Sequence, residues 1–137
     1  MQGRVLLAVS PEVERRLRAA LTGFHVTSTA TPQQLRRAIA AQPFDLIAVG
    51  THFVESMALA LIEEIRRAAP RTGVICVHGL PFRHVGKPTL EAFRLACEAL
   101  GVPLVIDLLD YPEGEAGNRA ISALFGKLSS PHQATSA

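Results

Sequence analysis

The stretch Phe44–Gly50 most constrains what this chain can fold into. It reads FDLIAVG, a short apolar run with an acidic residue near its start and a glycine at its end. Apolar runs of this length, bounded by turn formers, predict a strand buried on both faces, as in a parallel sheet. Because helical patterns flank it on both sides, we expect it at the centre of that sheet. In such folds binding sites lie at the carboxyl ends of the strands, where this strand carries Gly50, Thr51 and His52.

Amphipathic helical patterns alternate with short apolar runs along the whole chain. The predicted strands are Val5–Val9, Phe24–Thr29, Phe44–Gly50, Val74–Val77 and Val102–Leu109. The predicted helices follow the N-cap residues Ser10, Thr31 (with Gln34 completing a capping box), Ser56 and Thr89, and the last covers Glu115–Leu128. This alternation predicts an α/β fold with one parallel sheet. Right-handed crossovers favour the strand order 2-1-3-4-5, with helices on both faces in a three-layer sandwich.

Length and composition predict a single domain over residues 1–128 and a small, polar, disordered tail over residues 129–137. Hydrophobic residues make up 48% and charged residues 19%, which excludes disorder for most of the chain. The net charge of +2 is too small to indicate a nucleic-acid partner. No window approaches the roughly 20 apolar residues of a membrane span, and the first apolar run is too short for a signal peptide. We therefore expect a cytoplasmic protein with no nucleic-acid or membrane partner.

The cysteines Cys76 and Cys97 have no C-x-x-C spacing, and each falls in a predicted strand or helix. We expect free, buried thiols in a reducing compartment. The arginine pairs are predicted to be solvated surface on outer helix faces; they are Arg15–Arg16, Arg36–Arg37 and Arg66–Arg67.

The strand and helix succession, with the Asp-Leu-Ile start of the third strand at Asp45, resembles the receiver domain of two-component response regulators. The resemblance covers roughly residues 4–128 and implies a flavodoxin-like fold and a role in signal transduction. It rests on topology and strand character, because the functional motifs of receivers are missing from this chain.

The departures fall on the residues that perform phosphotransfer in receivers. Receivers end their first strand with an acidic pair that holds Mg²⁺, where this chain has Val9 and Ser10. The phosphate-accepting Asp of receivers corresponds to Gly50, and their Thr or Ser after the fourth strand corresponds to His78. Their Lys near the end of strand five falls close to Asp107. Phosphotransfer requires a carboxylate nucleophile and an oxygen-ligated cation, so the resemblance implies a pseudo-receiver that is not phosphorylated at the usual site.

A cleft is expected where the carboxyl ends of the strands meet; its candidate residues are Ser10, Gly50, Thr51, His52, His78 and Asp107. Imidazoles of His52, His78 and His84 at this edge are of the kind that binds metals, and the helix starts could bind a phosphate-like anion. The alternative function is therefore a sensor of a small ligand or metal. The simpler interpretation is that these are ordinary polar loop residues and that Ser10 caps a helix, with no metal and no cofactor.

The loop Leu80–Lys87 is longer than the receiver pattern requires. It presents Phe82 beside Arg83 and His84, a composition suited to a partner contact, although a lid over the cleft is an equal interpretation. In receivers the fourth helix, fifth strand and fifth helix commonly contact partners, and the resemblance implies this surface within Thr89–Leu128.

Known catalytic and nucleotide-binding motifs are absent from the chain. It has no glycine-rich phosphate loop, no H-E-x-x-H and no G-x-S-x-G. We therefore expect no enzyme activity. The predicted function is a non-catalytic regulatory domain that acts through a protein partner or through self-association, for which a homodimer is one form.

Overall fold

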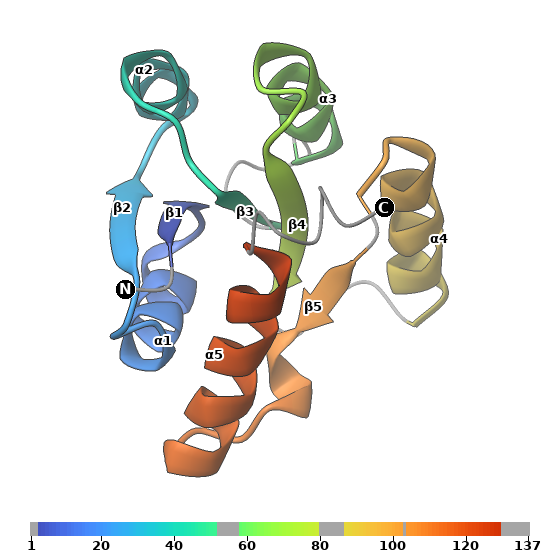
Figure 1. Cartoon of the computed structure of the whole chain (residues 1–137). Helices are drawn as coiled ribbons and strands as arrows, with labels where there is room; N and C mark the ends of the chain where they lie inside the picture. The colour runs from blue at the N-terminus through green and yellow to red at the C-terminus, as the bar shows by residue number, and fades with distance from the viewer. Residues whose placement is uncertain (1–2, 52–57, 80–86, 103, 130–137) are drawn as a thin grey trace.

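The computed structural model describes residues 3–51, 58–79, 87–102 and 104–129, and contains one parallel sheet (Figure 1). The strands are β1 (Arg4–Ala8), β2 (His25–Thr29), β3 (Leu46–Gly50), β4 (Gly73–His78) and β5 (Val105–Asp107). Their order is β2-β1-β3-β4-β5. The predicted α/β fold and strand order are therefore confirmed, and β3 lies at the centre of the sheet.

Helices cover both faces of the sheet. They are α1 (Pro11–Ala20), α2 (Pro32–Ala41), α3 (Ala58–Ala68), α4 (Lys87–Ala99) and α5 (Glu115–Leu128), with a 3₁₀ turn, η1 (Leu108–Asp110), after β5. Helices α1 and α5 lie on one face, and α2, α3 and α4 lie on the other (Figure 1). The structure is thus the three-layer sandwich expected from the alternating pattern.

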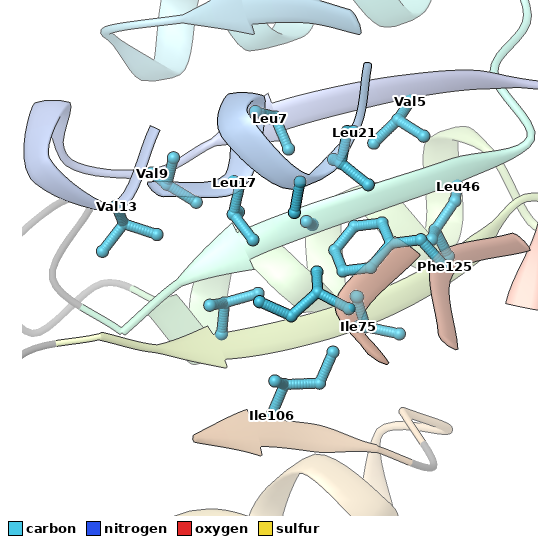
Figure 2. Packing of buried hydrophobic residues seen from close by; sticks show 14 of the residues in the cluster. Val5, Leu7, Val9, Val13, Leu17, Leu21, Leu46, Ile75, Ile106 and Phe125 are labelled. Atoms are coloured by element: carbon cyan, nitrogen blue, oxygen red, sulfur yellow. The ribbon is translucent and has the colours of Figure 1, made fainter. Parts of the chain in front are cut away.

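The central strand β3 joins the two apolar cores. All of its residues are buried. Leu46 and Ala48 face the core beneath α1 and α5, where the fully buried Phe125 of α5 packs (Figure 2). Ile47 and Val49 face the other core. Burying side chains of this size contributes about 1.5–3 kcal/mol each, so the unbroken apolar run of β3 stabilises both layers at once.

The first four strands differ from the predicted ranges by one or two residues at their ends, and the start of α4 and the length of β5 differ for identifiable reasons. Helix α4 begins at Lys87, so Thr89 lies inside the helix and is not its N-cap; Pro88, favoured in a first helical turn, is the better start signal. Strand β5 is shorter than the predicted run, because the Asp107 carboxylate accepts a hydrogen bond from Leu109 N (3.0 Å) and starts η1. Ser56, the third predicted cap, lies outside the described residues.

The starts of α1 and α2 carry similar sequences but differ in their caps. Thr31 Oγ1 accepts a hydrogen bond from Gln34 N (3.1 Å), and the Gln34 side chain accepts one from Ala30 N (2.7 Å). This is the predicted capping box, except that the Gln34 side chain accepts from the N–H of Ala30 and not from that of the N-cap residue Thr31. Ser10 holds the N-cap position of α1, yet its side chain makes no cap hydrogen bond. Its Oγ is buried and has no hydrogen-bond partner among the described residues.

We predict that Thr31→Ala lowers the free energy of unfolding by about 1 kcal/mol, because the cap bond to Gln34 is lost. Ser10→Ala is the matched control. It should leave the free energy of unfolding unchanged or raise it, because it removes a buried hydroxyl that has no partner. Urea denaturation of both variants measures the difference, and an equal loss in the two would contradict the assignment of the caps.

Candidate functional site

All five strands end at the same edge of the parallel sheet, which we call the carboxyl edge. The register aligns Ala8 with Val49, Gly50 with Val77, and His78 with Asp107. The described candidate residues at or just beyond these strand ends are Ser10, Gly50, Thr51, His78 and Asp107. The other candidates, His52, Phe82, Arg83 and His84, lie outside the described residues.

Gly50 packs directly against Val9 at this edge. Gly50 is buried, and a Cβ atom placed on it would lie 3.2 Å from both Cα and Cγ1 of Val9. Val9 is itself buried. The apolar side chain of Val9 therefore lies beside Gly50, the position that corresponds to the phosphate-accepting Asp of receivers.

A second close approach lies between β4 and α1. A Cβ atom on Gly79 would come within 2.4 Å of Val13 Cγ2 and 3.3 Å of Leu108 Cδ1. The chain leaving β4 thus passes between α1 and η1 with no room for a side chain. Val9 and Val13 lie close together at this end of the core (Figure 2). Apolar side chains therefore pack closely in this part of the carboxyl edge.

The polar contacts at the edge link neighbouring strands. Thr51 N donates to Val77 O (3.0 Å), and Thr51 Oγ1 is hydrogen-bonded to Nδ1 of the buried His78 (3.1 Å). Asp107 is engaged in its bond to Leu109 N. Thr51 and His78 are therefore brought together, whereas the Asp107 carboxylate caps η1. Among the described residues, no group of three His, Cys, Asp or Glu side chains could hold a metal ion.

A pocket of about 250 Å³ opens beside this close approach, between α1 and η1. It is lined by Glu12, Val13, Arg15, Arg16, Gly79, Leu108, Leu109, Tyr111 and Glu113. None of the described candidate cleft residues is in this lining. The space available for a ligand here therefore differs from the cleft that the sequence predicts.

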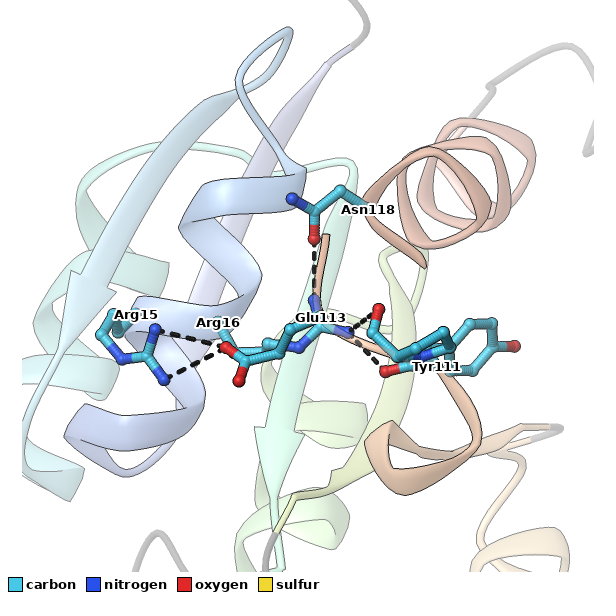
Figure 3. A network of polar contacts seen from close by, with 6 residues as sticks. Arg15, Arg16, Tyr111, Glu113 and Asn118 are labelled. Carbon is cyan, nitrogen blue, oxygen red and sulfur yellow. Dashed lines mark hydrogen bonds and ion pairs between the residues drawn. The ribbon is translucent and has the colours of Figure 1, made fainter. Parts of the chain in front are cut away.

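Arg16 is a structural residue that the sequence analysis misplaced. The prediction put it on a solvated helix face, but it is only 7% exposed. Its Nη1 donates to Asn118 Oδ1 (2.8 Å), and its Nη2 donates to the carbonyls of Tyr111 (2.5 Å) and Pro112 (3.0 Å) (Figure 3). We call this set of bonds the Arg16 latch. It ties α1 to the turn before α5 and to α5 itself.

The latch depends on a close backbone approach in α5. A Cβ atom on Gly117 would lie 1.8 Å from the Pro112 carbonyl oxygen, which is one of the acceptors of Arg16. A signal for the latch was present in the sequence. Arg16 follows Val13 by one helical turn and precedes Ala20 by another, so it lies on the buried stripe of α1. Neighbouring Arg15 is exposed and pairs with Glu113 (3.4 Å).

Comparisons with known proteins identify the fold. No protein-family model matches the chain, and no curated protein matches it. Among solved structures, a response regulator from Thermotoga maritima is 18% identical, with a TM-score of 0.71 over 94% of this chain and 98% of that chain. A Rhodopirellula baltica protein described as an adenylate cyclase is 18% identical, with a TM-score of 0.68 over 97% of this chain and 93% of that one.

A third similar structure is a Burkholderia pseudomallei response regulator with a phosphorylated aspartic acid, calcium ion and citrate. It is 17% identical, with a TM-score of 0.64 over 98% of this chain and 72% of that chain. At such identities these likenesses establish a receiver-like fold and no activity. Separately, none of the described helices is long and apolar enough to span a membrane.

We predict that Arg16→Met lowers the free energy of unfolding by about 2–3 kcal/mol, because buried oxygen acceptors lose their donors. Arg16→Lys should also lower the free energy of unfolding, since an ammonium group cannot match the forked geometry of the guanidinium. Arg15→Met is the control and should cost at most about 0.5 kcal/mol, as expected of an exposed ion pair. Guanidinium denaturation measures all three, and a wild-type midpoint for Arg16→Met would contradict the latch.

Proposed function

We propose that this chain is a pseudo-receiver: a non-catalytic regulatory domain that is not phosphorylated at the usual site and acts through protein contacts. The packing of Val9 against Gly50 carries this proposal. The space beside the acceptor position of a receiver is filled here by apolar atoms. A domain with this fold and without that chemistry retains its surfaces as the means of transmitting a signal.

The chemistry of phosphotransfer supports the first half of the proposal. A phosphoryl group needs a carboxylate to accept it and a cation held by oxygen ligands to neutralise its charge. The Burkholderia pseudomallei neighbour carries a phosphorylated aspartic acid and a calcium ion. At the corresponding positions this chain offers Val9, the single hydroxyl of Ser10, and Gly50. The bond between Thr51 and His78 adds no carboxylate.

We predict that acetyl phosphate with Mg²⁺ leaves the protein unmodified, because neither the acceptor nor the metal ligands are present. Intact-mass measurement tests this directly. A stoichiometric phosphoryl adduct that hydrolyses as an acyl phosphate would overturn the pseudo-receiver proposal.

The variant Gly50→Asp is the control for this experiment. It supplies a carboxylate but not the cation ligands, so it should also remain unmodified. Its new Cβ must displace Val9, which should lower the free energy of unfolding by about 1–3 kcal/mol. Adding Val9→Ala to Gly50→Asp should recover part of the lost free energy of unfolding. This double variant separates an effect of packing from an effect of charge.

The partner contact is proposed on the surface of α4, β5 and α5, which receivers commonly use. Among the described residues, the exposed large apolar side chains are Leu95 on α4 (65%) and Leu109 on η1 (60%). Of these two, Leu95 lies on the proposed surface, and an exposed apolar side chain there is suited to a protein contact. Phe82, Arg83 and His84 remain proposed contact residues of the preceding loop.

We predict that Leu95→Glu weakens self-association by about tenfold or more, because a charge would be buried in an apolar contact. Gel filtration with light scattering over a concentration series measures the effect. Arg37→Glu, at an exposed position on α2, is the control and should associate as the wild type does. Equal association of the wild type and Leu95→Glu would contradict this surface.

One observation favours the alternative function, a sensor of a small ligand or metal. Ser10 Oγ is buried at the start of α1 and has no partner among the described residues. If the carboxyl edge binds a metal, Zn²⁺ at micromolar concentration should raise the melting temperature, and His78→Ala should remove the rise. That result would favour the sensor function over the protein-interaction function.

A further inference from the structure

A groove of about 350 Å³ lies between α2 and α3, which stand beside each other over one face of the sheet (Figure 1). Both helices contribute to its lining, and no lining residue is shared with the pocket between α1 and η1. Small-molecule sites of this size are mostly apolar and carry a few polar groups that orient the ligand. The lining of this groove has the same division into an apolar part and a polar part.

The apolar part forms the floor of the groove. Leu35 on α2 and Ile65 on α3 are almost completely buried, at 1% and 2% exposed, and Ile39 is partly buried in the same core. Ala40 and Ala68 complete this part of the lining with small, exposed side chains. Because the two alanines leave open a space that larger side chains would fill, an aliphatic group of a ligand can pack there.

The polar part is one ion pair that joins the two walls of the groove. Arg36 Nε donates to Glu64 Oε2 (2.5 Å), and Arg36 Nη2 donates to Glu64 Oε1 (3.0 Å). Among the described residues, no other polar side-chain contact links α2 to α3. The hydrogen bonds from Arg36 lower the pKa of Glu64, and the same bonds raise the pKa of Arg36. Both groups are therefore charged at neutral pH, side by side in an aliphatic groove.

Each member of the ion pair has capacity for a further partner. The bonds to Glu64 use the Nε–H and one N–H of Nη2, which leaves the N–H groups of Nη1 and the second N–H of Nη2. Arg36 makes no other hydrogen bond with the described residues. Each Glu64 oxygen accepts one bond and keeps a second lone pair. The two side chains are 49% and 44% exposed, so a ligand can reach both charges.

We propose that the groove between α2 and α3 binds an aliphatic α-amino acid in its zwitterionic form. The ligand carboxylate accepts hydrogen bonds from the free edge of the Arg36 guanidinium, whose fork matches a carboxylate. The ligand ammonium donates to Glu64, and the ligand side chain packs against the aliphatic floor.

The charges of the groove select this class of ligand. A simple carboxylate would place a second negative charge beside Glu64, and a simple amine would place a second positive charge beside Arg36. A zwitterion brings an opposite charge to each member of the pair, and its two charged groups are adjacent, as those of the pair are. The aliphatic floor then favours an amino acid with an aliphatic side chain over a polar one.

A bound amino acid would connect α2 to α3 more firmly than the ion pair does. An exposed ion pair contributes little to stability by itself, whereas the ligand would contact both helices through its charges and its side chain. The proposal is independent of the pseudo-receiver function, because the groove shares no residue with the carboxyl edge or with the proposed partner surface. Either proposal can fail without the other.

The test is thermal unfolding of the full-length chain with L-leucine as the probe. We expect the melting temperature to rise by about 3–5 °C when L-leucine is about tenfold above its dissociation constant. Glycine carries both charges but no side chain, so it is the control for a general solute effect and should give a much smaller rise. L-Leucinamide lacks the carboxylate and 4-methylpentanoate lacks the ammonium, so each should bind at least about tenfold more weakly than L-leucine.

Variants of the lining test the site itself. Arg36→Met and Glu64→Gln each remove one charge and should weaken the binding of L-leucine by at least about tenfold. Arg37→Met is the matched control, because Arg37 is an exposed neighbour of Arg36 that does not line the groove. Ala68→Leu leaves both charges in place and should weaken binding by filling the space. Melting curves without ligand establish that each variant is folded.

Backbone amide chemical shifts of the isotope-labelled protein locate the bound ligand. The changes on adding L-leucine should fall mainly in α2 and α3. Three results would overturn the proposal: an effect of L-leucine no larger than that of glycine, unchanged binding in both Arg36→Met and Ala68→Leu, or chemical-shift changes confined to other elements.

Discussion

The burial of β3 on both faces is the constraint on which the rest of the structure depends. Leu46 and Ala48 lie in one core and Ile47 and Val49 in the other, so neither layer of helices can be removed without exposing apolar surface. Its neighbours β1 and β4 are held in register on either side. The carboxyl ends of these strands consequently share one edge, and every candidate site residue that the structure describes derives its position from that register.

Apolar packing determines the chemistry of the carboxyl edge. Val9 lies against Gly50, and Gly79 passes between Val13 and Leu108. These contacts place apolar atoms beside Gly50 and Gly79 at this edge. The pseudo-receiver function that we propose rests on this packing, and that proposal assigns the function of the domain to its surfaces.

Arg16 shows how a single buried cation can join two helices without a carboxylate. Its donors go to two carbonyl oxygens and one side-chain amide oxygen, and no ion pair with it occurs among the described residues. Burial of a charge is tolerated only where its hydrogen bonds are satisfied. The latch therefore couples the position of α1 to the start of α5, next to the pocket between α1 and η1.

The sequence by itself determined the strand order and the capping box at Thr31, because both follow from local periodicity and from a few general rules of chain connection. Tertiary structure decided what local patterns leave open. Whether Arg16 points to solvent or into an interface depends on where Tyr111 and Pro112 place their carbonyls, far along the chain. A local pattern specifies which face of an element is buried, and only the distant segment packed against that face decides what each side chain on it contacts.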